Sequence, residues 1–179
     1  MNRVCGNCQL CCKLLPVPQM EKPANQRCQH QKHGVGCSIY ESRPQSCRLW
    51  SCQWLTNPDT NAMRRPDRSH YCIDPVPDFI RLINNEDGTE TKIPVLQIWC
   101  DPDFPNSHRD PALRAFLERL AEKTGMAALI RFSNKEAIVL LAPPLTGGEW
   151  LESGGTSEKE HNAAQINAAL TDFYAAEQA

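Results

Sequence analysis

Residues 5–12 read Cys-Gly-Asn-Cys-Gln-Leu-Cys-Cys, and this stretch holds four of the ten cysteines of the 179-residue chain. Five more follow it, so nine of the ten cysteines lie between Cys5 and Cys72. The same segment is rich in Pro, Gln, Arg and His and has few long apolar runs. A segment of this composition cannot build a large hydrophobic core, so we expect bound metal to hold it together.

The compartment decides how such a cysteine pattern is interpreted. No secretory signal precedes Cys5, and no run approaches the roughly 18 apolar residues of a membrane span. We therefore expect a cytoplasmic protein that does not associate with membranes. Cytoplasmic thiols are kept reduced, so a dense cysteine pattern indicates metal binding or catalysis before it indicates disulfides.

Soft thiolates favour zinc, iron–sulfur clusters and copper(I). We predict that the metal ligands are Cys5, Cys8, Cys11, Cys12, Cys28, Cys37, Cys47, Cys52 and Cys72. On a helix, Cys5, Cys8 and Cys12 would share one face, whereas the neighbours Cys11 and Cys12 would diverge by about 100°. Two metal sites or one polynuclear site follow from this divergence. Tetrahedral zinc and a [4Fe–4S] cluster both stay open, as does the pairing of the cysteines.

Further anchors follow the first four cysteines in a fixed order. They are Lys22-Pro23-Ala24, Arg27-Cys28-Gln29-His30, Gly36-Cys37-Ser38-Ile39-Tyr40 and Arg43-Pro44 with Cys47-Arg48. Over residues 5–72 this order resembles the CxxCxxCC cysteine-cluster family, described as a zinc- or iron-chelating domain. The resemblance implies a bacterial origin, metal chelation by the cysteines and a biochemical role that is mostly unassigned. It does not extend to the chain after residue 72.

The charge is distributed unevenly along the chain. Residues 1–72 contain ten Lys and Arg against four Asp and Glu, and residues 73–179 contain nine against seventeen. A basic segment is one signature of nucleic-acid binding, but thiolates bound to metal would offset this positive charge. We therefore expect the basic residues to balance sulfur charge, and Tyr40, Trp50 and Trp54 to shield the metal from water, not to stack on bases.

His30, His33 and Cys100 have weaker claims as ligands, and Arg43 has a separate expected role. His30 and His33 lie between Cys28 and Cys37, where an imidazole can replace a thiolate, but we expect surface or hydrogen-bonding roles for them. Cys100 follows an apolar strand-like run, so we expect it in the core. Arg43 is expected to fix a turn and to hydrogen-bond sulfur or backbone.

The chain after Asp74 reads as ordinary α+β sequence. Strands are predicted over 79–83 and 93–99, and we expect these two to pair as a hairpin. A helix is predicted from an Asp110 cap and Pro111 to Gly125, and further strands over 128–132 and 137–141. A capping box at Ser157 and Glu160 predicts a last helix with Ile166, Leu170 and Phe173 on one face. We expect three units, namely 1–75 as the metal-binding module, 76–145 as a small α+β unit, and 146–179 as a loop and helix. The predicted fold is thus α+β, with a small irregular metal-stapled module followed by a small antiparallel sheet and one or two packed helices.

The function that these residues favour is metal binding, with zinc or iron chelated by the cysteine cluster. One alternative is a [4Fe–4S] redox enzyme or electron-transfer protein, and another is a zinc-organised module that binds a protein partner. No Gly-rich phosphate loop, nucleophile elbow or dinucleotide fingerprint is present, which disfavours a hydrolase. Whether the protein is an enzyme stays open, and metal ions are the expected ligands.

Overall fold

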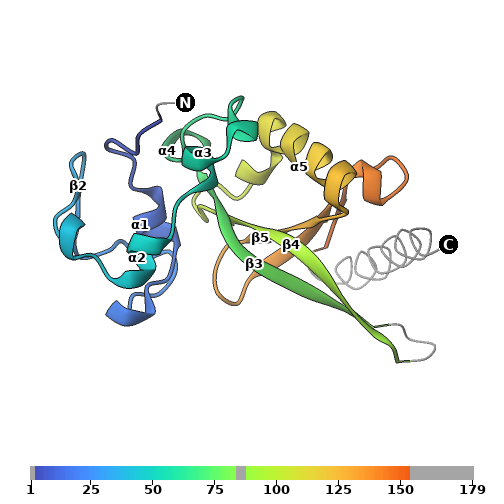
Figure 1. Ribbon diagram of the computed structural model, residues 1–179, viewed down its shortest axis with the longest axis horizontal. Coiled ribbons are helices and arrows are strands. Elements are labelled where there is room, and N and C mark those ends of the chain that lie inside the picture. Colours follow the sequence, from blue (N-terminus) through green and yellow to red (C-terminus); the bar gives the residue numbers. More distant parts are fainter. Residues whose placement is uncertain (1–2, 84–87, 154–179) are drawn as a thin grey trace.

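The structure is a computed structural model in which residues 3–83 and 88–153 are described. Figure 1 shows the cysteine-rich segment, in blue and cyan, beside one end of a sheet that is covered by a single long helix, α5. The α+β class predicted from the sequence is confirmed. No helix within the described residues has the length and apolar character needed to cross a membrane.

Short elements make up the cysteine-rich segment. Its α-helices are α1 (Leu10–Leu14), α2 (Gln45–Leu49), α3 (Gln53–Thr56) and α4 (Pro66–Ser69). Its 3-10 turns are η1 (Pro18–Met20), η2 (Tyr40–Ser42) and η3 (Pro58–Thr60), and its strands are β1 (Gln31–Lys32) and β2 (Gly36–Cys37). Helices of four or five residues are not stable alone, so these elements depend on packing and on side-chain hydrogen bonds.

One helical expectation for this segment is wrong. Cys5, Cys8 and Cys12 do not form a stripe on one helix, because α1 begins only at Leu10. Cys5 and Cys8 precede it in a turn closed by a 2.9 Å hydrogen bond from the Cys8 amide to the Cys5 carbonyl. Gly6 adopts a φ of 54° in this turn, a left-handed conformation that glycine tolerates and that a continuous helix excludes.

The five-stranded sheet has the order β3-β4-β5-β6-β7. Its strands are β3 (Tyr71–Ile83), β4 (Glu90–Cys100), β5 (Ala127–Arg131), β6 (Ala137–Leu141) and β7 (Leu151–Glu152). The predicted hairpin is confirmed, since β3 and β4 pair antiparallel with Tyr71 opposite Cys100. Because β3 begins at Tyr71, this strand crosses the boundary expected after residue 75.

The expectation of a wholly antiparallel sheet is wrong for one pair of strands. β4 and β5 run parallel, with Val95 opposite Ala127 and Trp99 opposite Arg131. The connection between them contains η4 (Ser107–Arg109) and helix α5 (Pro111–Thr124). A helical crossover returns the chain to the end of the sheet where β4 began, so β5 runs in the same direction as β4.

Helix α5 begins and ends where the sequence predicted. The Asp110 carboxylate accepts a 2.9 Å hydrogen bond from the Ala112 amide, and Gly125 ends the helix in a left-handed conformation with φ 67°. Leu113, Phe116 and Leu117 face the sheet and join one core cluster with its central strands. The remaining 3-10 turn, η5 (Pro143–Leu145), follows β6, and the predicted last helix with Ile166, Leu170 and Phe173 lies outside the described residues.

A buried carboxylate joins the cysteine-rich segment to the sheet. Asp74 lies on β3 with only 7% of its surface exposed, and it accepts hydrogen bonds from the indole nitrogens of Trp50 at 2.8 Å and Trp99 at 3.1 Å. The Val76 amide donates a third bond at 3.0 Å, across the irregularity in β3 between Asp74 and Asp78. Trp50 follows α2 directly, so this carboxylate fixes the end of a cysteine-bearing helix to the sheet.

Candidate metal centre

All ten cysteines are free thiols, and their exposure follows their position relative to the sheet. Cys100 is fully buried in the main core, as predicted. Cys52 and Cys72 are also buried, Cys5 is exposed, and the other predicted ligands, Cys8, Cys11, Cys12, Cys28, Cys37 and Cys47, are half-buried. The nine predicted ligands therefore include buried, half-buried and exposed thiols.

Four thiols gather where α1 packs against the sheet; we call Cys8, Cys11, Cys52 and Cys72 the inner thiols. Cys72 on β3 belongs to a small apolar cluster with Leu10 and Leu14 of α1 and Trp99 of β4, and Cys8 and Cys11 pack against this cluster. Cys52 immediately precedes α3 and accepts a hydrogen bond from the Cys72 thiol.

The inner thiols act on one another electrostatically. The hydrogen bond to Cys52, together with complete burial and the charges of Cys52, Cys11 and Cys8, holds the pKa of Cys72 well above its usual value. The pKa of Cys52 is lowered by the same hydrogen bond. Without a cation, Cys72 therefore holds a proton that a metal ion would displace.

A second set of thiols includes Cys12, the neighbour of Cys11 in α1; we call Cys12, Cys28, Cys37 and Cys47 the outer thiols. The Cys11 thiol donates a hydrogen bond to Cys12, so the two sets adjoin. The Cys28 amide donates a 3.1 Å hydrogen bond to the Cys12 carbonyl, which brings the loop before β1 against α1. Cys37 lies opposite Gln31 in the β1–β2 pair. Burial raises the pKa of Cys47, and the charges of Cys12, Cys28 and Cys37 raise it further, so these thiols lie within electrostatic reach of one another.

The side chain of Gln9 ties the β1–β2 loop to the start of α1. Its amide nitrogen donates to the carbonyls of Lys32 and, at 3.3 Å, Gly36, and its oxygen accepts a 2.8 Å bond from Gln31. Gln9 is 8% exposed. This buried amide thus places Cys37 near the first turn of α1 without any contribution from a hydrophobic core.

Lys22 is the residue that sequence reasoning missed. Its side chain is 6% exposed, and its ammonium group donates to the carbonyls of Lys13 at 3.2 Å, Pro23 at 3.1 Å and Leu15. Burial lowers the pKa of Lys22, while nearby thiols, those of Cys28 and Cys12 foremost, oppose this effect. Its place between the cysteines, in the Lys22-Pro23-Ala24 anchor, was the one signal in the sequence.

Cys12 is an acidic thiol because Cys11 donates a hydrogen bond to it and because two cations lie nearby. The hydrogen bond from Cys11, assisted by the charges of Lys22 and Arg43, lowers the pKa of Cys12 to about 7. Arg43 itself donates a 2.8 Å hydrogen bond to the Tyr40 carbonyl and lies over the Tyr40 ring, so it fixes this turn as predicted. A thiolate near neutral pH is the form that binds metal.

The donor set suits a thiophilic metal, but the side chains are not gathered at ligand positions. Within residues 3–83 and 88–153, no group of three or more His, Cys, Asp or Glu side chains is arranged to hold one metal ion. Ligation therefore requires cysteine side chains to turn about their Cα–Cβ bonds, which have three staggered positions. His33 is exposed, and the carbonyl of His30 accepts a hydrogen bond from Ser38.

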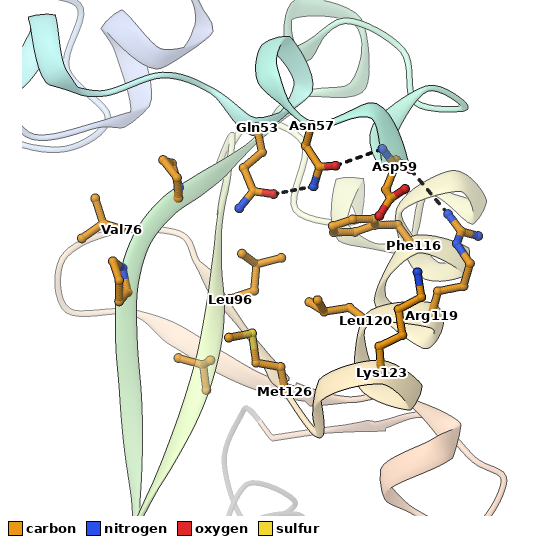
Figure 2. A pocket seen from close by; sticks show the side chains of 13 residues that line it. Gln53, Asn57, Asp59, Val76, Leu96, Phe116, Arg119, Leu120, Lys123 and Met126 are labelled. Carbon is orange, nitrogen blue, oxygen red and sulfur yellow. Dashed lines mark hydrogen bonds between the residues drawn. The ribbon is translucent and has the colours of Figure 1, made fainter.

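A separate groove lies between α3, α5 and the first two strands of the sheet. Figure 2 shows an apolar floor of Leu96, Phe116, Leu120 and Met126 beneath a polar rim that includes Gln53. Its volume is about 300 Å³, and none of the residues that line it is a cysteine. The rim is cross-linked internally by a 3.1 Å hydrogen bond from Asn57 to Gln53 and by a 3.5 Å bond from Arg119 to the Asp59 carbonyl.

No protein-family model, curated protein or solved structure matches this chain. The resemblance to the CxxCxxCC family therefore rests on the quoted motif residues alone.

Proposed function

We propose that this protein binds a thiophilic metal, zinc or iron, through the cysteines of residues 5–72, and that the metal stabilises this segment of the fold. The observation that carries the proposal is the collection of eight thiols into two neighbouring sets around α1, in a segment built from very short elements. Clustered thiolates repel one another, so such a collection is favourable only when the sulfurs are protonated or share a cation.

The surrounding charges support this proposal. Lys22 is buried among the thiols. Burial and the charges of Cys52 and Cys12 raise the pKa of Cys5, and the charges of Arg43 and Arg65 act in the opposite direction. These cations would offset part of the net negative charge of a four-thiolate divalent site. Charge compensation of this kind is the role that we propose for these basic residues.

The aromatic side chains near the thiols support the proposal as well. Trp50 packs against the cluster that contains Cys72, Leu14 and Trp99, and its indole nitrogen is held by Asp74. An apolar surround of this kind limits the access of water to sulfur and slows the loss of a bound ion.

The direct test is the metal content of the protein purified without oxygen. Elemental analysis should find zinc or iron bound in stoichiometric amounts, and an absorption spectrum separates the two cases, because an iron–sulfur centre is brown and zinc is colourless. The Cys100→Ala variant is the matched control, since it removes a thiol from the core without touching either set, and it should retain the full metal content. A wild-type protein that takes up neither zinc nor iron on reconstitution would contradict the proposal.

A further inference from the structure

We infer that the groove between α3, α5, β3 and β4 binds a small monocarboxylate with an apolar body, of the size of a medium-chain fatty acid. The described residues that line this groove include no cysteine, so the inference is independent of the proposed metal binding. The groove volume of about 300 Å³ lies at the lower end of the range for small-molecule sites. At about 30 Å³ for each group the size of a water molecule, it holds a ligand of about ten non-hydrogen atoms.

The floor of the groove belongs to the main hydrophobic core, so its shape is fixed before any ligand binds. Leu96 on β4 and Phe116 on α5 are 8% and 3% exposed and are members of the core cluster, against which Leu120 and Met126 pack. Figure 2 shows these four side chains around one space between α5 and the strands. An apolar ligand chain in this space would remove apolar surface from water, which is favourable.

The outer wall is an irregular part of β3, residues 75–77. It lies where the pairing of β3 with β4 shifts register, and its two prolines restrict the backbone. The Val76 carbonyl accepts a 3.3 Å hydrogen bond from Gln97, and the Val76 amide is held by Asp74. Val76 lines the groove and is 51% exposed. The wall is therefore held firmly in place and adds apolar surface at the mouth of the groove.

Two cations stand at the rim on the side of α5. Arg119 and Lys123 are exposed and lie four residues apart, so they share one face of the helix. Figure 2 shows both side chains extending toward the turn that carries Asp59. Neither cation forms a salt bridge in the part of the chain that the structure describes, and Arg119 makes only a 3.5 Å hydrogen bond to the Asp59 carbonyl. With the Asp59 carboxylate, these two cations give the rim a net positive charge of one, which favours a monoanion.

Gln53 adds an oriented hydrogen-bond donor to the rim. Its amide oxygen accepts a 3.1 Å bond from Asn57, whose own oxygen is held by the Asp59 amide at 2.9 Å. Its amide nitrogen donates no hydrogen bond to any other described residue, and Figure 2 shows the side chain pointing from α3 into the groove. A carboxylate at the rim thus has a donor in Gln53 and an attractive field from the two cations, while its chain covers the apolar floor.

The test titrates the full-length protein with octanoate, a carboxylate of this size, and with the uncharged octanol. Methyl NMR reports where each compound binds. Octanoate should shift the methyl signals of Leu96, Leu120 and Met126, with a Kd of about 1 mM or lower. Octanol should shift the same signals but bind about tenfold more weakly, because it does not interact with the two cations.

Three variants assign the binding to the groove. The double variant Arg119→Gln and Lys123→Gln should bind octanoate about tenfold more weakly and octanol as before, since it removes only the rim charges. Lys135→Gln is the matched control, because Lys135 is exposed and lies outside the groove, and it should bind both compounds like the wild type. Met126→Trp places a larger side chain in the groove and should abolish the binding of both.

The possible results have distinct meanings. Octanoate that binds no more tightly than octanol, or a double variant that keeps the wild-type affinity for octanoate, would overturn the assignment of an anionic ligand. Absence of binding up to about 10 mM, or shifts confined to methyl groups away from the groove, would overturn the site itself. The metal proposal is tested by metal content and stands or falls separately.

Discussion

Replacing Asp74 by Asn tests the connection between the cysteine-rich segment and the sheet. The Asp74 carboxylate accepts three hydrogen bonds, two at one oxygen from Trp50 and Val76 and one at the other oxygen from Trp99. An asparagine can present only one oxygen. Its amide nitrogen would then face an N–H donor, so at least one of the three bonds is lost.

The magnitude follows from the number and kind of these bonds. A hydrogen bond to a charged group contributes about 1.5–3 kcal/mol, and a neutral one about 0.5–1.5 kcal/mol. Asp74→Asn loses one charged bond and weakens two, and this loss is partly offset because a buried charge no longer has to be desolvated. We expect the free energy of unfolding to fall by about 2–3 kcal/mol.

Urea unfolding of the reduced protein with a chelator present measures this change without any contribution from bound metal. Trp50 and Trp99 report on it directly through their fluorescence. Asp78→Asn is the matched control on the same strand. Asp78 pairs with Arg131 at 2.8 Å, and both side chains are about one-quarter exposed. This substitution should therefore lower the free energy of unfolding by about 1 kcal/mol or less. If Asp74→Asn and Asp78→Asn destabilise the protein equally, the three-bond account of Asp74 is refuted.

Three further predictions concern other parts of the molecule. Leu14→Ala should lower the free energy of unfolding, measured in urea, by about 2–5 kcal/mol, because Leu14 is fully buried. Leu49 is exposed, so Leu49→Ala should change this free energy by less than about 0.5 kcal/mol. Equal effects of the two variants would contradict the packing of α1 on the sheet. The Glu152 carboxylate lies 3.5 Å from the His108 imidazole and also contacts two arginines, and these groups hold the pKa of Glu152 well below its usual 4.5. The stabilisation that Glu152 contributes is therefore present above pH 4.5 and is lost as the pH falls below it. The Tm difference between wild type and Glu152→Gln should therefore shrink in acid, and a difference that stays constant with pH would rule this out. In the reduced metal-free protein, the rate of alkylation of Cys12 should rise as the pH passes about 7, the value to which its pKa is lowered. Peptide mass spectrometry measures this rate for each cysteine. An equal rate for the adjacent Cys11 would contradict the prediction.

Local patterns in the sequence predicted much of the regular part of the fold. Helix α5 has its capping aspartate, its Pro111 and its terminal Gly125 at the ends of the span that it occupies, and apolar runs marked β4, β5, β6 and the second half of β3, but not the first half of β3 or β7. The burial of Cys100 followed from its place at the end of one of these runs. Such features depend on neighbours within a few residues, so they can be predicted without the tertiary structure.

The sequence by itself also determined which atoms are available for metal, since nine cysteines fall within residues 5–72. Only the tertiary structure decided how they are grouped. Cys72 meets Cys8 and Cys11 because β3 packs against α1, and Cys28 meets Cys12 through a loop held by hydrogen bonds. The burial of Lys22 and Asp74 and the parallel pairing of β4 with β5 likewise depend on contacts between distant segments. No periodicity in the chain encodes those contacts, because they arise from the packing of whole elements against one another.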